Sequence, residues 1–356
     1  MSVVGVTLWR PSEHDKRSCS ACPIANGALV KLTAHFDTLL TDRVNLSASR
    51  LESLESRAGK IYAALNRDET LGPMVHDMSP QGSWAQKTII NPSSGRDFDA
   101  DFTLHLADDS SWTPKDYLNA TRKALHDHHD YTGMTLNRKT RCVRVLYAND
   151  FHVDVVPSIE RGGVRYIANY DDDNWEPTNP SGFTTWMQAK DADTHGNLRK
   201  VIRLFKWVRD NRNSFNGVRS ILLTTMLGDR VSSANEIFDS GYYADLSSSF
   251  FHLVNDLDDY VWARQNKPSV TDPSGTGLTF DHRWTQETYA NFRKRLHTIA
   301  DTTTRAYEST DKDESVELWQ TLFGPGFKEA GVSTGRQRFG KPEESAASSF
   351  IAGRAG

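Results

Sequence analysis

Cysteine is scarce in this chain, because its 356 residues include three, Cys19, Cys22 and Cys142. This low content excludes a disulfide-stabilised scaffold and fits a reducing compartment, so we expect a cytoplasmic protein. Cys19 and Cys22 form a CxxC pair, but a structural zinc site usually takes four ligands from two such pairs. Because the sequence has no second pair, we interpret both as incidental surface cysteines and leave metal binding open.

Long hydrophobic segments and an excess of positive charge are also missing. The sequence has no apolar N-terminal region of the secretory kind and no run of about eighteen apolar residues, so we expect neither secretion nor a membrane span. Its 42 lysines and arginines face 46 aspartates and glutamates, for a net charge of −4. Proteins that bind duplex nucleic acid strongly are normally basic, so we expect no such partner, although local basic stripes could hold phosphate groups.

One segment, from Phe98 to Leu106, alternates strictly between apolar even positions and polar odd positions. Such alternation predicts a half-buried strand. Asp99 and Asp101 then project from the same face, one pleat apart. Two carboxylates this close raise each other's pKa unless cations neutralise them. Since Mg²⁺ prefers a few carboxylates together with phosphate oxygens and water, the pair predicts a metal site.

A third carboxylate, Asp154, lies on the polar face of a second alternating segment, residues 151–156. Residues 141–147 are interpreted as the strand before it, and residues 148–150 as a hairpin turn. A continuous sheet would place Asp154 beside Asp99 and Asp101.

An Asp-x-Asp pair alone is a weak signal, since it also occurs at solvated strand edges and in metal-dependent glycosyltransferases. Two further features favour a metal–nucleotide site, namely Gly82 and Ser83 upstream and Asp154 downstream. A glycine lets backbone N–H groups approach phosphate oxygens, and a serine hydroxyl adds a donor. We predict that Asp99, Asp101 and Asp154 hold two divalent cations.

Three segments resemble the active-site blocks of DNA polymerase β-type nucleotidyltransferases: QGS at 81–83, FDADFTLHL at 98–106 and FHVDVVP at 151–157. More narrowly, they resemble the CD-NTases of CBASS anti-phage defence, the bacterial relatives of cyclic GMP-AMP synthase and oligoadenylate synthase. Further similar segments begin at Asn179, Gly196, Val218 and Glu314. The resemblance covers roughly residues 30 to 328.

The resemblance implies a two-lobed α/β (α+β) fold, with a mixed catalytic sheet and a helical C-terminal lobe. It implies that Asp99, Asp101 and Asp154 bind two Mg²⁺ ions, with Mn²⁺ as an alternative. The implied reaction joins nucleoside triphosphates, with ATP and GTP expected, into a cyclic di- or trinucleotide second messenger, and releases pyrophosphate in a bacterial cytoplasm. The pair Gly82 and Ser83 would contact the β- and γ-phosphates of the donor nucleotide.

The helical segment from Gly196 carries a basic face made of Arg199, Arg203 and Lys206. Patterning alone interprets such a face as solvated. The resemblance implies instead that Lys206 grips the donor triphosphate and that Ser220 shares this task. We therefore predict a nucleotide-binding set of Gln81, Gly82, Ser83, Arg203, Lys206 and Ser220. Trp84, Tyr170 and Trp175 are candidates for stacking on a base, with core packing as the alternative for each.

The predicted organisation has four parts. They are an irregular arm at 1–26, a catalytic lobe with a long N-terminal helix at 27–180, a helical lobe at 181–330 and a flexible tail at 331–356. Ser49 and Glu52 form a capping-box pattern at the start of the long helix, which the resemblance implies bridges the lobes. Pro114 suits the first position of a helix that begins after Thr113.

Alternatives remain within and outside this chemistry. A linear-product enzyme, similar to oligoadenylate synthase or a tRNA-adding transferase, would favour a long basic groove, and the acidic balance counts against it. A DxD glycosyltransferase would place a nucleotide-binding α/β unit before the pair, and the helical pattern of residues 27–65 does not. The resemblance also makes the tail, which ends in Gly356, a candidate substrate of an E1/E2-like conjugating enzyme.

Overall fold

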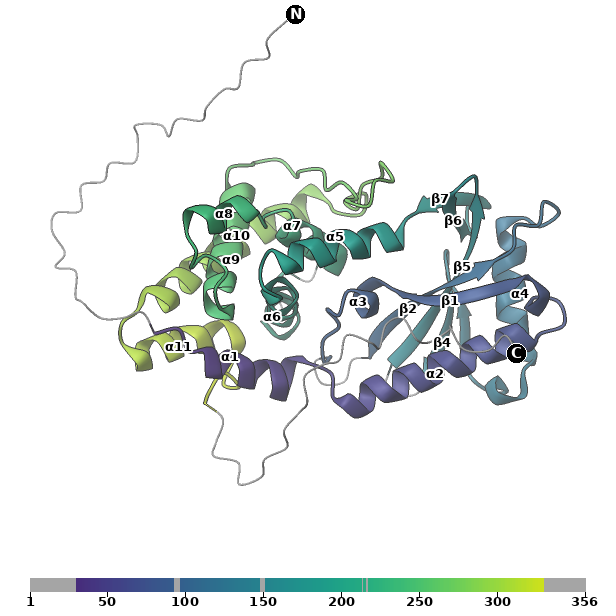
Figure 1. The fold of residues 1–356 in the computed structure, drawn as a ribbon, viewed down its shortest axis with the longest axis horizontal. Coiled ribbons are helices and arrows are strands. Elements are labelled where there is room, and N and C mark those ends of the chain that lie inside the picture. The colour runs from purple at the N-terminus through teal and green to yellow at the C-terminus, as the bar shows by residue number, and fades with distance from the viewer. Residues whose placement is uncertain (1–29, 93–96, 148–150, 213, 216, 330–356) are drawn as a thin grey trace, which may run out of the picture.

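The computed structural model describes residues 30–92, 97–147, 151–212, 214–215 and 217–329. Figure 1 shows a sheet flanked by long helices at one end of the molecule and a bundle of helices at the other. The predicted mixed α/β architecture, with a catalytic sheet and a helical C-terminal lobe, is confirmed.

Seven strands form one sheet in the described part of the chain: β1 (Val75–Gln81), β2 (Phe98–Leu106), β3 (Leu136–Arg138), β4 (Val143–Tyr147), β5 (Phe151–Arg161), β6 (Val164–Asn169) and β7 (Asn174–Thr178). Their order is β1-β2-β5-β4-β3, and β6 pairs with both β5 and β7. The pairing of β2 with β5 is parallel and the other pairings are antiparallel, so the sheet is mixed. The predicted strands at 98–106, 141–147 and 151–156 are present, whereas the predicted turn at 148–150 lies outside the described residues.

The α-helices of the described residues are α1 (Thr33–Leu39), α2 (Ala48–Arg67), α3 (Gly82–Ala85), α4 (Pro114–Asp127), α5 (Pro180–Ala192), α6 (Asn197–Arg212), α7 (Ser220–Gly228), α8 (Ser233–Phe238), α9 (Leu246–Trp262), α10 (Gln286–Glu308) and α11 (Lys312–Phe323). None of the described helices is long and apolar enough to cross a membrane.

The helix caps confirm one prediction and correct another. Thr113 caps α4 in a capping box, and Pro114 occupies the first turn, as expected. The capping box predicted at Ser49 is wrong, because Ser47 is the cap of α2 and its side chain accepts from the Arg50 N–H. Ser47 has an extended backbone, whereas Ser49 already lies inside the first helical turn, where a side chain cannot cap.

Two hydrophobic cores underlie the two lobes. The first contains the buried side chains of α2, α4 and the sheet, among them Leu54, Ile61 and Leu65. The second contains buried side chains of α1 and of the helices from α5 onward except α8, including Phe36 and Phe205. Buried side chains of α2 therefore belong to the sheet core alone, and the chain passes between the lobes near Val44, before α2 begins.

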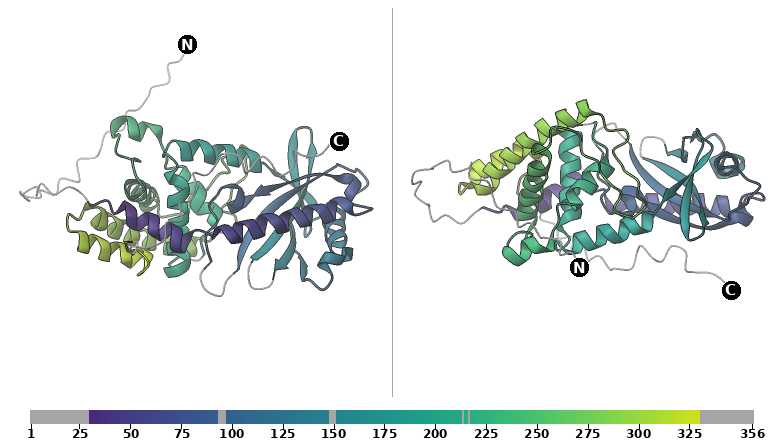
Figure 2. Two further views of the ribbon diagram at one scale, coloured as in Figure 1. Left: turned by 60° about the horizontal axis from the view of Figure 1, so that its bottom comes forward. Right: turned by 90° about the horizontal axis from the view of Figure 1, so that it is seen from above.

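The two hydrophobic cores can be compared with the residue ranges predicted for the two lobes. Residues 32–44 fall in the predicted catalytic lobe but pack in the helical core, while the start of α5 at Pro180 coincides with the predicted change of lobe. The division of the chain into four domains stays a prediction. Figure 2 shows α1 and α2 as consecutive helices that run past both lobes.

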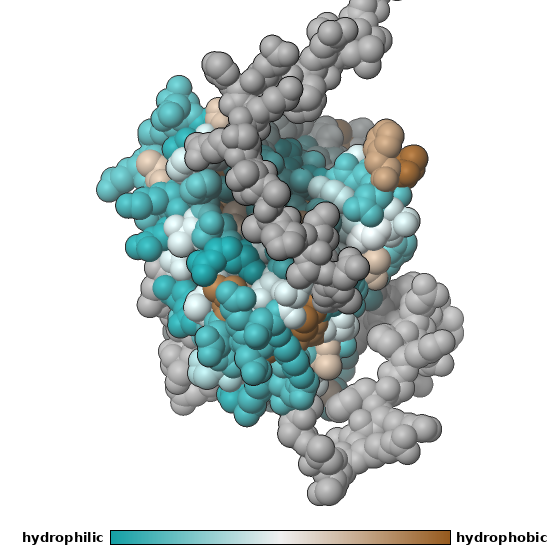
Figure 3. Space-filling model, turned by 90° about the vertical axis from the view of Figure 1, so that its left-hand side faces the viewer, coloured by the Kyte–Doolittle hydropathy of each residue, from teal (hydrophilic) through white to brown (hydrophobic). Residues whose placement is uncertain are grey.

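The surface of the helical lobe is mostly polar. The face in Figure 3 is largely hydrophilic, and its hydrophobic spots are small and separate. Among the described residues, Ile237 and Phe238 of α8 are the most exposed large apolar side chains. Since scattered apolar side chains are normal on a soluble surface, we draw no site from them.

Candidate active site

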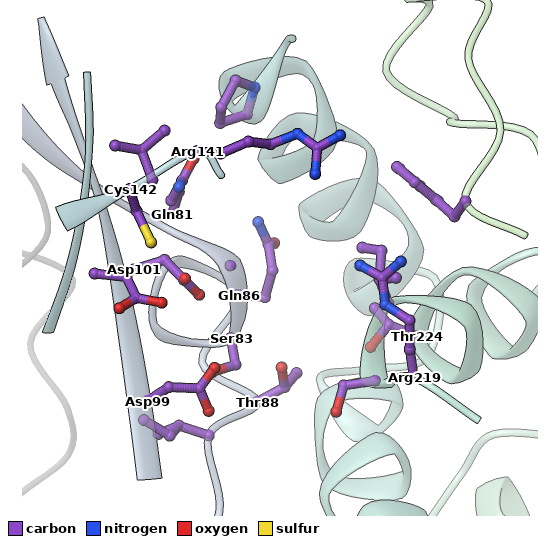
Figure 4. A pocket seen from close by; sticks show the side chains of 18 of the residues that line it. Gln81, Ser83, Gln86, Thr88, Asp99, Asp101, Arg141, Cys142, Arg219 and Thr224 are labelled. Carbon is purple, nitrogen blue, oxygen red and sulfur yellow. The ribbon is translucent and has the colours of Figure 1, made fainter. Parts of the chain in front are cut away.

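The three predicted metal ligands come together through strand register. Asp101 of β2 and Asp154 of β5 are directly paired across the parallel ladder, and Asp99 lies one pleat away, beside His152. The apolar even positions of β2 are buried, so Asp99 and Asp101 leave the core face together, as the alternation predicts. Figure 4 shows both carboxylates on one strand, facing the segment that carries Ser83.

The third carboxylate has a partner that sequence reasoning missed. Arg144 of β4 is the register partner of Asp154. Its Nε donates to Oδ1 and its Nη2 to Oδ2, each at 2.7 Å, so the guanidinium binds both carboxylate oxygens. Asp154 is buried, with 6% of its surface exposed, which makes this a largely desolvated ion pair.

Electrostatics at Asp101 reflect burial and the crowding of acidic groups. Burial, followed by the charges of Asp99 and Asp154, raises its pKa to about 7 against the opposing effect of Arg144. The carboxylate cluster therefore carries more negative charge than its single guanidinium partner neutralises. Such a cluster attracts cations with oxygen-preferring chemistry.

Gly82 is required by its contact with the acidic cluster. Its φ is +60°, a left-handed value that favours glycine. A Cβ at this position would collide with the Oδ2 of Asp101. Ser83 follows in the first turn of α3, and Gln81 precedes it as the register partner of Asp101. The Gln81 Oε1 accepts from the Thr103 hydroxyl at 2.9 Å, which ties this end of β1 to β2.

The basic face of α6 is not solvated, which corrects the interpretation from patterning. Arg199 Nε donates to the carbonyl of Gln86, Arg203 Nη1 to that of Lys87, and Lys206 Nζ to that of Thr88. Three cations spaced along one helix thus bind three successive carbonyls of the segment that follows α3. The segment carrying Ser83 is in this way held against the helical lobe.

Lys206 is the most deeply placed of these cations. It is 3% exposed, and its Nζ also lies 3.2 Å from the Thr88 hydroxyl. Burial, together with the charge of the nearby Arg209, lowers its pKa to about 7. Ser220 begins α7 and accepts from Arg209 Nη1 at 3.1 Å.

Both lobes line one cleft of about 1370 Å³. Eight of the nine predicted site residues are among its lining residues: Gln81, Gly82, Ser83, Asp99, Asp101, Asp154, Lys206 and Ser220. Arg203 is not in the lining, and its Nη1 donates to the carbonyl of Lys87. Of the three aromatic candidates for base stacking, Tyr170 lines the cleft, whereas Trp84 and Trp175 pack against the sheet core.

A separate group of metal-ligand types lies at the end of α4. In the described part of the chain, His128, His129 and Asp130 are the one trio whose ligand atoms all lie within 4.8 Å of one another. Two of the three are exposed and none lines the cleft, so the trio is a surface cluster apart from the predicted site.

Comparison with known proteins agrees with this geometry. Residues 30–191 match the family model of the Second Messenger Oligonucleotide or Dinucleotide Synthetase domain. A cyclic AMP-AMP-AMP synthase of Acinetobacter sp. is 25% identical over 258 residues, which cover 69% of this chain and 71% of that protein. A solved structure of the Bradyrhizobium diazoefficiens CD-NTase CdnG with GTP superimposes with a TM-score of 0.65 at 18% identity, covering 83% of this chain and 96% of that one. Residues 30–191 are therefore similar to a second-messenger synthetase domain, and the fold is similar to that of a solved CD-NTase.

A second curated relative shows how far products vary among proteins similar to this chain. The c-di-GMP synthase of Roseivirga ehrenbergii is 25% identical over 248 residues, covering 58% of this chain and 66% of that protein. The two relatives are therefore equally similar to this chain while their names specify different bases and different ring sizes.

Several cleft residues were not predicted from sequence. Arg219 and Arg283 line the cleft, and burial together with its neighbours Arg283 and Arg141 lowers the pKa of Arg219. Figure 4 shows Arg219 and Thr224 on the helical side, opposite Asp99 and Asp101. The pairing of Arg144 with Asp154 could have been predicted from the sequence. In a hairpin whose last pair is Tyr147 and Phe151, residues at equal distances from that pair lie opposite each other. Arg144 lies three residues before Tyr147, and Asp154 lies three residues after Phe151.

Cys142 is buried and also lines the cleft. Burial raises the pKa of its thiol, and the charge of Asp154 adds to the effect. A thiol that stays protonated is a poor nucleophile and a poor metal ligand. The three aspartates are therefore the better ligand set.

Proposed function

We propose that this chain condenses nucleoside triphosphates into a cyclic di- or trinucleotide second messenger, with release of pyrophosphate, in anti-phage signalling. One observation carries this proposal. The β2–β5 register sets Asp101 beside Asp154, with Asp99 one pleat away, in a cleft that Gly82, Ser83 and the helical lobe also line. Similarity to the synthetase domain model and to a cyclic AMP-AMP-AMP synthase supports the same reaction class.

The donor triphosphate would lie between α3 and the helical lobe. Gly82 leaves its backbone open to close approach, and Ser83 offers a hydroxyl and an N–H in the first turn of α3. Ser220 and Lys206 face the same cleft from α7 and α6. Together these groups would hold the β- and γ-phosphates, with Gln81 and Arg203 keeping β1 and the segment after α3 in place.

The carboxylates fit the metal that the family uses. Asp99, Asp101 and Asp154 offer hard oxygen ligands, and the pKa of Asp101 is raised by burial and then by the negative charges of the other two. We assign Mg²⁺ to these three residues, with Mn²⁺ as an alternative. Two such ions, when bound, supply activation of the acceptor hydroxyl and neutralise charge on the departing pyrophosphate.

The protein's own groups orient the reaction. Asp154 would accept the proton of the attacking 2′- or 3′-hydroxyl at a carboxylate oxygen, opposite the donor phosphates held by Ser83 and Ser220. Attack then runs in line at the α-phosphate. Drug-sized ligands fill pockets of about 300 to 1,000 Å³, so a cleft of about 1370 Å³ can take a donor and an acceptor nucleotide together.

The proposal extends to the substrates, the location and the tail of this protein. ATP and GTP are the expected substrates, and the different products named for the two relatives leave the base choice to be measured. Location in a bacterial cytoplasm stays a prediction. The tail at 331–356 lies outside the described residues, so its conjugation by an E1/E2-like enzyme also stays a prediction.

The test is a product assay. Purified protein is incubated with Mg²⁺ and radiolabelled ATP, GTP, CTP and UTP, singly and in pairs, and the products are treated with phosphatase. A labelled product that resists phosphatase has internal phosphodiesters only, and mass spectrometry gives its composition and ring size. Products that lose their 5′-phosphates would instead show a linear-product enzyme, and no nucleotide turnover in any mixture would overturn the proposal.

A further inference from the structure

Arg144 binds both carboxylate oxygens of Asp154, which are the atoms that would coordinate a metal ion. The two residues are register partners on β4 and β5, and two hydrogen bonds of 2.7 Å engage both carboxylate oxygens. Both side chains line the cleft, and that of Arg144 is 28% exposed. The guanidinium therefore reaches Asp154 from the solvent-accessible side of the site.

The geometry of the three carboxylates agrees with this competition. No choice of one oxygen from each of Asp99, Asp101 and Asp154 brings all three within 4.8 Å of one another. One ion bound by all three carboxylates at once would therefore need a rearrangement of at least one side chain. Both oxygens of Asp154 are already bound by the planar guanidinium group of Arg144.

We propose that Arg144 competes with the divalent cation for Asp154, holding the third carboxylate until the metal and the nucleotide arrive together. This inference rests on the proposed metal site at the three aspartates. It makes Arg144 a positioning residue, because it acts through Asp154 and not on the reacting atoms.

Charge gives the direction of the effect. A guanidinium beside the carboxylates repels an incoming dication and occupies its ligand oxygens, so it weakens binding of the metal alone. Metal delivered with a triphosphate brings its own negative charge, which offsets the repulsion. Arg144 would thereby disfavour loading by free metal and favour loading by the metal–nucleotide complex.

The experiment measures Mn²⁺ binding by the electron paramagnetic resonance of the free aquated ion, without nucleotide. Arg144→Met removes the charge and keeps the aliphatic stem, and it should bind Mn²⁺ about tenfold more tightly than the wild type. Arg144→Lys keeps the charge and loses the fork, so its affinity should lie between the two. With a non-hydrolysable ATP analogue present, the difference between Arg144→Met and wild type should shrink.

A matched control lies at the end of β5. Arg161 makes the same two-point contact with Asp108, at 2.7 Å and 2.7 Å, and neither residue lines the cleft. Arg161→Met should leave Mn²⁺ affinity unchanged. The double variant Arg144→Met with Asp154→Asn should lose the gain in affinity, which places the gained contact at Asp154.

The outcomes separate the two hypotheses. Equal or weaker Mn²⁺ binding by both Arg144 variants, with wild-type binding intact, overturns the competition and leaves the metal site standing. Absence of Mn²⁺ binding in every variant overturns the metal site and the competition together. A purely structural role for Arg144 cannot produce tighter binding, and thermal unfolding of each variant shows whether the fold is retained.

Discussion

Lys206 of α6 donates to the backbone carbonyl of Thr88 at 3.0 Å, across the boundary between the helical lobe and the sheet lobe. The contact is buried and is the last of three that run from Arg199 through Arg203 along the helix. A residue that the family resemblance places on the donor triphosphate thus also holds the segment after Ser83. Our proposed function would therefore couple phosphate binding to the positioning of this segment through the Lys206 side chain.

Lys206→Met should weaken binding of a non-hydrolysable ATP analogue about tenfold, because a charge facing the phosphates is lost. The pKa of Lys206 is lowered to about 7, mainly by burial, so the wild-type side chain is largely neutral at pH 8. A triphosphate would raise that pKa again, so binding at pH 8 should take up a proton. Calorimetry in two buffers of different ionisation enthalpy, without metal, measures both quantities.

Lys200→Met is the control for this prediction. Lys200 lies on the same helix, donates to Asn197 Oδ1 and is not in the cleft lining, so affinity and proton uptake should be unchanged. If Lys206→Met matched the wild type in both quantities, the role of Lys206 would be confined to holding Thr88.

Gly82→Ala should reduce nucleotide synthesis about 100-fold, because the new Cβ meets the Asp101 carboxylate and displaces it from its position. The left-handed backbone at Gly82 adds a loss of stability of about 1 kcal/mol. Gly163→Ala separates the two effects, since Gly163 has φ +78° and no atom within 4 Å of the new Cβ. It should lose similar stability and keep its activity, as steady-state rates and urea unfolding would show.

The double substitution Asp99→Asn and Asp101→Asn should abolish turnover while the protein stays folded. Both side chains leave the core face of β2, so the change removes metal-binding charge without opening a cavity. Asp127→Asn, at an exposed carboxylate on α4, should retain full activity. Rates in Mg²⁺ and far-UV circular dichroism provide the measurement, and a double variant with more than a few per cent of the wild-type rate would refute the assignment.

Stability should depend on pH through Asp101. Its pKa is raised to about 7 in the folded protein, so the folded state holds this proton more tightly than the unfolded chain does. Ionisation of this carboxylate therefore destabilises the folded state. The destabilisation is absent near pH 4 and grows as pH rises through 7. By linkage, the rise from 3.8 to about 7 is worth at most about 4 kcal/mol.

Asp101→Asn removes this pH-dependent destabilisation, because an amide does not ionise. With a chelator present, this variant should be more stable than the wild type by a few kcal/mol at pH 8 and by much less at pH 4.5. Urea unfolding at both pH values measures the difference. A stability gain that is equal at the two pH values would contradict the raised pKa.

Local patterns in the sequence determined much of the sheet and of the acidic face. Strict alternation from Phe98 to Leu106 predicts both the strand and the shared face of Asp99 and Asp101, because side-chain direction in a strand depends on residue parity alone. The apolar stripe of α6 and the start of α4 at Pro114 are similarly local. The capping box failed at Ser49 because Ser47, two residues earlier, offers the same chemistry and takes the cap.

The tertiary structure decided what each charged group contacts. Patterning predicts a solvated basic face on α6, yet Arg203 and Lys206 bind carbonyls more than a hundred residues away, and only the docking of the lobes brings these together. The collision that forbids a side chain at Gly82 depends likewise on the antiparallel pairing of β1 with β2. Local sequence determines the face of a helix or strand from which a side chain projects. The partner of that side chain depends on how elements distant in sequence pack together. At this site the partners determine how far each charge is neutralised.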